Sequence, residues 1–159
     1  KKGYKKVVLA GWSGGGSLSL FYQAQAEHPT ITETPAGDPL DLVGANLAGV
    51  DLSNARLENT RLEGASLIGA HLDSAWLNGA DLSNANLSGA TLSQAQLATA
   101  RLGSANFSHA DLSGAAFVDA ALANADFTGA NLEGTDFAGA ELTGTRGLEA
   151  VPGQAASNG

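Results

Sequence analysis

The sequence contains no Cys and no Met, and only 4 Pro and 6% aromatic residues among its 159 positions. The absence of Cys excludes a disulfide framework and any Cys-based metal site. No apolar run approaches the ~20 residues of a membrane-spanning helix, so we expect no contact with a membrane. Basic residues are also scarce, because 8 Lys and Arg stand against 16 Asp and Glu, for a net charge of −8. This charge opposes direct binding of nucleic acid.

A large apolar residue does recur, at every fifth position from Leu42 to Leu142. The series holds 21 residues, of which 17 are Leu and 4 are Phe. A period of five fits neither the 3.6-residue period of a helix face nor the two-residue alternation of a strand. A fixed repeat of this kind indicates an architecture of stacked units, which has to be considered before any local secondary structure.

Two further columns accompany the large apolar residue. Ala stands two residues before it at 17 of the 21 positions, and Gly or Asn stands two residues after it at 15. Gly and Asn tolerate the positive φ that the third residue of a type II turn requires. Each five-residue unit therefore predicts a short extended piece followed by a turn. One large and one small side chain point inward, and the other three face solvent.

Units such as Ala80–Asn84, Ala85–Gly89 and Ala130–Gly134 match the pattern A-(D/N)-L-x-x. On these residues, the segment from about 38 to 146 resembles the pentapeptide-repeat family. The resemblance implies an all-β solenoid, namely a right-handed quadrilateral β-helix with four pentads in each coil and about five coils. At a strand spacing of about 4.8 Å, the rod would be roughly 25 Å long.

Four pentads in each coil predict how the core is arranged. Residues four pentads apart should stack in one column, and residues two pentads apart should lie on opposite walls. We therefore expect Leu82 in the core, Phe107 stacked on Phe127, and Phe117 stacked on Phe137 in the opposite column. Each buried Leu or Phe contributes on the order of 1.5–3 kcal/mol. No ionisable residue is expected inside, so we predict no metal, no cofactor and no catalysis there.

The outer surface is predicted to be acidic. Residues 38–149 hold 14 Asp and Glu against four Arg. They contain no Lys, because all four Lys lie in the first six residues. Duplex DNA carries about 15 negative charges over the same ~25 Å, so the rod approaches the charge density of DNA. One predicted face collects acidic side chains with His71 as its only possible cation: Asp51, Asp73, Asp111 and Glu133.

Trp76 and two His residues complete the surface prediction. Trp76 precedes a core Leu and should point outward, either as an anchor for a partner protein or partly covered by its neighbours. His71 and His109 should lie far apart along the rod, so we expect no metal site at either residue.

The first part of the chain follows a different pattern. Residues 5–10 predict a buried strand, Gly11-Trp12-Ser13-Gly14-Gly15 follows, and residues 17–27 predict a helix. G-x-S-x-G in this context resembles the nucleophile elbow of the α/β-hydrolase family, over about residues 5–37. The resemblance implies Ser13 as nucleophile and the backbone N–H of Gly14 as an oxyanion donor. The chain supplies neither the remaining sheet nor a positioned His, so we expect no catalytic activity.

Other interpretations of this segment remain open. Three origins fit the segment: a genuine fusion, a remnant of a hydrolase, or a joining error. Whatever its origin, the segment can serve as an N-terminal cap, since an open β-helix end exposes unpaired backbone groups. A third interpretation is a secretory signal, with basic residues 1–6 and a cleavage-like Ala24-Gln25-Ala26. Because the chain begins with Lys1 rather than Met, we expect it to be a fragment or a processed product.

The predicted organisation thus has three parts: 1–37 as hydrolase-like segment and linker, 38–146 as β-helix, and 147–159 as C-terminal cap and disordered tail. In the last part, Leu148 and Val151 are expected to cover the final coil.

Three functional hypotheses follow from these patterns. The first is a non-enzymatic scaffold or protein-binding module that acts through its acidic surface. The second, implied by the resemblance, is a DNA mimic that binds and protects a type II topoisomerase such as gyrase. The third is an inactive α/β-hydrolase remnant. We expect a cytoplasmic protein whose partner is another protein. Dimerisation is compatible with the sequence, but no feature of the sequence supports it.

Overall fold

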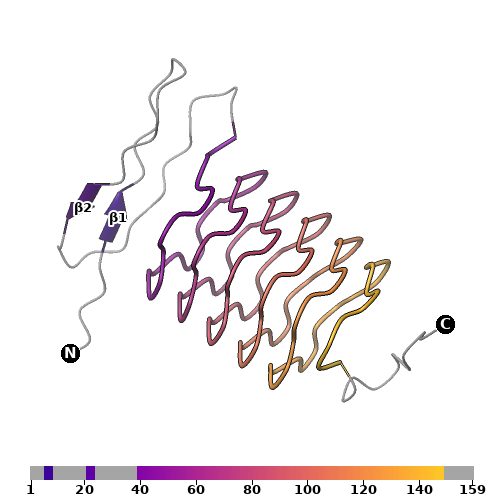
Figure 1. The fold of residues 1–159 in the computed structure, drawn as a ribbon. Coiled ribbons are helices and arrows are strands. Elements are labelled where there is room, and N and C mark those ends of the chain that lie inside the picture. The colour runs from indigo at the N-terminus through magenta and orange to yellow at the C-terminus, as the bar shows by residue number, and fades with distance from the viewer. Residues whose placement is uncertain (1–5, 9–20, 24–38, 149–159) are drawn as a thin grey trace.

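The computed structural model describes residues 39–148 and two short strands, β1 (Lys6–Val8) and β2 (Phe21–Gln23). Residues 39–148 wind into stacked coils of nearly constant shape, which together form a rod (Figure 1). The predictions for Ser13, Gly14 and the linker fall outside the described residues.

The two strands form an antiparallel pair in which Val7 lies opposite Tyr22 and Val8 lies opposite Phe21. The strand predicted over residues 5–10 is confirmed at residues 6–8. The helix predicted over residues 17–27 is wrong at residues 21–23, which are extended. Aromatic and β-branched residues favour cross-strand pairing, and a short isolated helix is marginal in water. The strand–turn–helix order of a hydrolase elbow is therefore not observed at these residues.

The coils are held in register by parallel bridges. Each bridge pairs a residue with the one 20 positions later, from Asp41↔Arg61 to Asp126↔Arg146. This spacing confirms that four pentads make one coil. The bridges are isolated rather than joined into long strands, because each pentad supplies only a short extended piece before the chain turns.

Each pentad turns in the same way. In the first unit, the amide of Ala45 donates to the carbonyl of Leu42 at 3.0 Å. Gly44, the third residue of that turn, has a φ of 65°. Every equivalent residue through Gly144 also has a positive φ, including six that are neither Gly nor Asn: Ser74, Gln94, Thr99, Ser104, His109 and Asp119. The repeat imposes the left-handed conformation even where the residue disfavours it.

Backbone hydrogen bonds then connect each coil to the next. Leu62 donates to the carbonyl of Asp81 at 2.7 Å, and Gly64 donates to that of Ser83 at 2.9 Å. In the reverse direction, Asp81 donates to the carbonyl of Thr60 at 2.9 Å. This pattern repeats along the rod and satisfies backbone groups that would be costly to bury unpaired.

The core is the column of large apolar residues predicted from the sequence. Leu82 and Phe107 are fully buried, and Phe137 is 5% exposed. The rings of Phe107 and Phe127 are stacked with centroids 5.1 Å apart, and those of Phe117 and Phe137 with centroids 5.3 Å apart. Phe107 and Phe117 meet edge to face across the interior, at 5.7 Å. The two predicted Phe columns are confirmed.

The last described residues pack against the end of the rod. Leu148 is half-buried against the core cluster, whereas Val151 lies outside the described residues. Gly147 has a φ of +80°, and a Cβ at this position would collide with the backbone of Phe127 and Thr128. Only Gly fits here, for reasons of both conformation and space.

We predict that Gly147→Ala destabilises the last coil by more than the cost of placing Ala at a positive φ, because its Cβ would also collide with the neighbouring backbone. Gly89→Ala is the matched control, because Gly89 has a φ of +64° but open space around its missing Cβ. The control should cost about 1–2 kcal/mol from the left-handed backbone. Gly147→Ala should also speed amide hydrogen exchange in residues 131–146, where Gly89→Ala should not. Equal exchange in the two variants would contradict the steric argument.

Candidate functional site

Each wall of the rod presents one pentad from every coil, so outward residues 20 apart share a wall. The walls differ in charge. The acidic face carries Asp51, His71, Asp73, Asp111 and Glu133. The opposite wall, the mixed-charge face, carries Asp41, Arg61, Glu63, Asp81, Arg101 and Glu141. The tryptophan face carries Arg56, Glu58, Trp76, Asp119 and Asp136.

The fourth wall, the neutral face, carries Asn46, Ser66, Ile68, Asn86 and Asn106, with charges only at its C-terminal end. This wall is not among the surfaces predicted from the sequence. The signal was present in the sequence, because a wall without charge follows from the same four-pentad spacing.

The acidic face contains four carboxylates and no Lys or Arg among its five pentads: Val50–Asn54, Ala70–Ser74, Ala90–Gln94, Ala110–Gly114 and Ala130–Gly134. The coil stacking therefore brings Asp51, Asp73, Asp111 and Glu133 onto one wall, as predicted. No other wall has a comparable excess of negative charge, because every Arg of residues 39–148 lies on one of the other three walls.

Hydrogen bonds between coils hold two of these carboxylates in place. Thr91 Oγ1 donates to Asp73 Oδ2 at 2.6 Å, and the amide of Ser93 donates to Asp73 Oδ1 at 3.1 Å. Asn131 Nδ2 donates to Asp111 Oδ1 at 3.0 Å. The Asp73 and Asp111 side chains are thus oriented before any partner arrives. Sequence spacing could place these residues on one wall, but not identify the donors.

The same contacts keep Asp111 ionised. The backbone N–H of Ser113 donates to its carboxylate and lowers its pKa, which outweighs the opposing effect of partial burial. The side chains of Ser113, Asn131 and Ser93 lower the pKa further. Hydrogen bonds to the charged form of a carboxylate favour that form.

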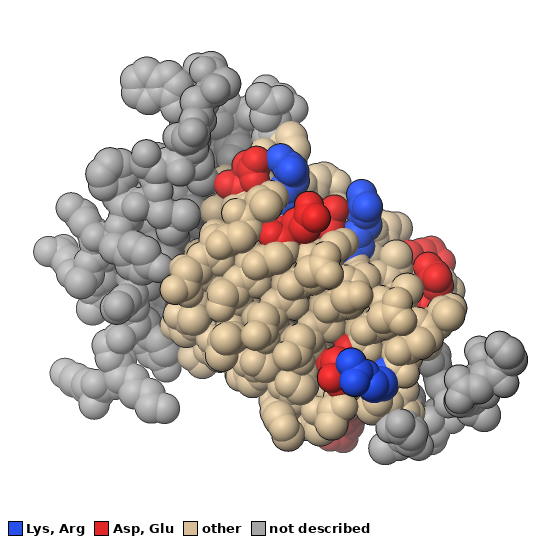
Figure 2. All heavy atoms as spheres, viewed as in Figure 1, with Lys and Arg blue, Asp and Glu red and all other residues tan. Residues whose placement is uncertain are grey.

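The mixed-charge face balances its cations locally. Arg61 Nη1 lies 2.7 Å from Asp41 Oδ2, and Arg101 Nη1 lies 3.5 Å from Asp81 Oδ2. Partial burial raises the pKa of Asp81, but hydrogen bonds from Ser83 and the charges of Arg101 and Arg61 outweigh it, so the pKa is lowered. Figure 2 shows these alternating charges as a row along one edge of the visible surface. Exposed pairs of this kind contribute only about 0–1 kcal/mol each.

The other two Arg residues are also paired. Arg56 Nε lies 3.3 Å from Glu58 Oε1 on the tryptophan face, and Arg146 Nη2 lies 3.8 Å from Asp126 Oδ2 at the C-terminal end of the neutral face. Each Arg of residues 39–148 therefore has a carboxylate neighbour on its own wall. The acidic face keeps its negative potential because it shares none of these cations.

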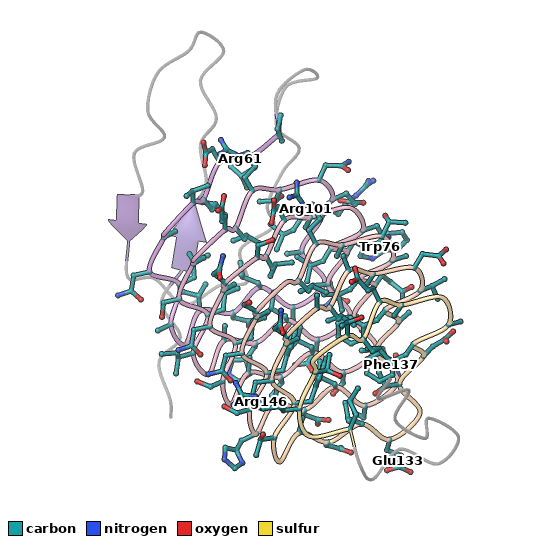
Figure 3. All side chains as sticks on the ribbon, turned by 45° about the vertical axis from the view of Figure 1, so that its right-hand side comes forward. Arg61, Trp76, Arg101, Glu133, Phe137 and Arg146 are labelled. Atoms are coloured by element: carbon teal, nitrogen blue, oxygen red, sulfur yellow. The ribbon has the colours of Figure 1, made fainter. Side chains whose placement is uncertain are left out.

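Trp76 points outward, as predicted, and is 51% exposed. Its column places Arg56 one coil before it and Gln96 one coil after it. The side chain lies on a different side of the rod from Glu133 and Arg146 (Figure 3). About half of the Trp76 surface is therefore available to a partner.

Within residues 39–148 and the two strands, no group of three or more His, Asp or Glu side chains is arranged to hold a metal ion. His71 and His109 occur on different walls, and His71 Nδ1 lies 3.3 Å from Thr91 Oγ1. In the same described residues, no helix is long and apolar enough to span a membrane.

The family model of pentapeptide repeats matches residues 41–79, 65–103 and 105–144 of this chain. The chain belongs to the pentapeptide repeat family. This assignment, together with the coil geometry, confirms the right-handed quadrilateral β-helix predicted from the sequence. No curated protein matches the chain.

Several crystal structures of pentapeptide repeat proteins are similar to the chain. One from Nostoc Pcc 7120 is 33% identical, with a TM-score of 0.52, and the match covers 64% of this chain and 84% of that one. One from the thylakoid lumen of Arabidopsis thaliana is 31% identical, with a TM-score of 0.49 and coverages of 69% and 75%. One from Cyanothece 51142 is 37% identical, with a TM-score of 0.40, and the match covers 60% of this chain and 63% of that one, so the chain spans less than two thirds of this relative.

The lowered pKa values predict how stability depends on pH. Asp81, Asp111 and Asp126 all have folded-state pKa values below the ordinary value. Their contribution to stability is therefore complete above the unfolded pKa of about 3.9 and is lost as pH falls through the lower folded value. We expect the urea midpoint to drop below about pH 4, and Asp111→Asn to flatten that drop.

Glu63→Gln controls for net charge, because it removes one exposed carboxylate of the mixed-charge face. If Asp111→Asn leaves the acid limb of the stability curve as steep as in the parent chain, the hydrogen bonds to Asp111 do not stabilise its charged form.

Proposed function

We propose that this protein is a non-enzymatic scaffold that binds a basic segment of another protein through the acidic face. The observation that supports this most strongly is the separation of charge between walls. Four carboxylates share a wall that has no Lys or Arg, while the four Arg of residues 39–148 pair with carboxylates on other walls.

The carboxylates suit this role because two of them, Asp73 and Asp111, are held by hydrogen bonds, which also lower the pKa of Asp111. The hydrogen bonds to Asp73 and Asp111 limit the side-chain entropy that is lost on binding. A wall of one charge sign raises the association rate of an oppositely charged partner, and salt screens this effect. Lys or Arg of the partner would form charge-assisted hydrogen bonds with the carboxylates.

Trp76 offers an apolar contact beside this wall. Asp73 and Trp76 are separated by only Ser74 and Ala75, and the chain turns between the acidic and tryptophan faces at that point. Exposed Trp residues are frequent anchors of protein interfaces. A partner that covers the acidic face could therefore reach Trp76 around the corner.

Fluorescence anisotropy with a labelled Arg-rich peptide tests the proposal. The acidic-face triple variant Asp51→Asn, Asp111→Asn, Glu133→Gln should weaken binding at least tenfold at low salt. The control triple variant Glu63→Gln, Asp119→Asn, Glu141→Gln removes the same charge from other walls. It should weaken binding no more than about threefold, because the charges it removes act only at long range.

Equal losses in the two triple variants would show that net charge, rather than the acidic face, attracts the peptide. Absence of binding by the parent chain at low salt would reject the proposal itself.

The DNA-mimic hypothesis has one supporting observation. Residues 39–148 hold 12 Asp and Glu against four Arg on a narrow rod. However, the carboxylates are concentrated on some walls and absent from most of another, whereas the phosphates of DNA follow both strands around the duplex. We expect no inhibition in a gyrase supercoiling assay. Inhibition that is lost in the acidic-face triple variant would instead favour the DNA mimic.

For the N-terminal residues, we propose an inactive segment that caps the first coil, with Ser13 and Gly14 having no catalytic role. A cytoplasmic location stays a prediction, and a related protein comes from the thylakoid lumen.

A further inference from the structure

The neutral face differs from the rest of an otherwise charged rod. Over its first four coils it carries no Asp, Glu, Lys or Arg, and it presents Asn46, Ser66, Ile68, Asn86, Ser88, Asn106 and, at the turn of the fourth coil, His109. Figure 2 shows a broad area without Asp, Glu, Lys or Arg, bordered by the row of alternating charges on one side and by a charged pair at its lower end.

The Asn side chains of this surface are also preorganised. The side-chain oxygen of Asn86 accepts from the amide of Ser88 at 3.1 Å, and that of Asn106 accepts from the amide of Ser108 at 2.9 Å. These bonds hold the Asn side chains close to the backbone, so that little side-chain entropy remains to be lost on docking. Ile68 is 46% exposed and is the largest apolar side chain on this wall.

We propose that the neutral face is the site at which a second copy of this chain binds, so that two rods associate side by side. The argument for this occupant is electrostatic. The acidic, mixed-charge and tryptophan faces each carry more Asp and Glu than Arg, whereas the described part of the neutral face carries one Asp, one Arg and one His. Two identical acidic rods repel each other least when their neutral faces meet.

The charges on the flanking walls also select the orientation. In an antiparallel two-fold pair, the acidic face of one copy would lie beside the acidic face of the other. In a parallel pair, whose two-fold axis runs along the rods, the acidic face of one copy lies beside the mixed-charge face of the other. That face presents Arg61 and Arg101, with side chains 52% and 72% exposed. The parallel pair is therefore favoured.

The interface is limited to one wall of a short rod. We therefore expect a reversible dimer with a dissociation constant in the micromolar range, whose population rises with protein concentration.

Sedimentation velocity of the full chain, from about 5 to 500 µM, tests the association. The parent should shift from monomer to dimer over this range. Ile68→Asp should weaken dimerisation at least tenfold, because it places two carboxylates in the interface. Val118→Asp, at the same pentad position on the opposite wall, is the control and should dimerise like the parent. Circular dichroism melts of both variants verify that they remain folded.

Because the chain lacks Cys, single Cys substitutions report the orientation without background. Ala48 and Ser108 occupy the same pentad position in coils near the two ends of the neutral face. With a short bis-maleimide, a parallel dimer should cross-link Ala48→Cys to itself and Ser108→Cys to itself. A cross-link that forms only when the two variants are mixed would reject the parallel arrangement.

A parent chain that stays monomeric at 500 µM, or a Val118→Asp variant that loses dimerisation as Ile68→Asp does, would overturn the proposal. These results are independent of the acidic-face experiment, since Ile68→Asp leaves the acidic face intact.

Discussion

The fold depends on one repeated constraint: in every five residues, one large apolar side chain must be buried and the chain must then turn with a positive φ. Burial of the Leu and Phe columns provides the stabilising free energy, and the turn returns the backbone to the next wall. Burial and turning are carried out by the inward and turn positions of each pentad. The outward positions are therefore left to carry charge, amides or an aromatic ring without disturbing the coils.

Much of this architecture could be predicted from the sequence, because the five-residue period admits few structures. The stacking of Phe107 on Phe127 followed directly from four pentads per coil. The left-handed conformation of Gln94 and Thr99 did not, since neither residue prefers it and the repeat overrides local propensity. The helix predicted over residues 17–27 failed at residues 21–23, where pairing with β1 prevails over helical periodicity.

The candidate binding surface was predictable in location but not in detail. Spacing alone placed Asp73 and Asp111 on one wall. The donors that orient them, Thr91 and Asn131, depend on side-chain rotamers that no spacing specifies. The neutral face shows the opposite case, because its charge-free pentads are visible in the sequence once the walls are counted. The net charge of the chain does not reveal these differences, because it sums the charges of all four walls.

The strict alignment of residues 20 apart also limits how this protein can change in length. Loss or gain of a single pentad preserves the buried column and the turns, so the rod would still fold. Every later outward residue, however, would rotate by a quarter turn onto the next wall. The acidic face would be divided between two sides of the rod, and only insertion or deletion of a whole coil would keep each surface continuous.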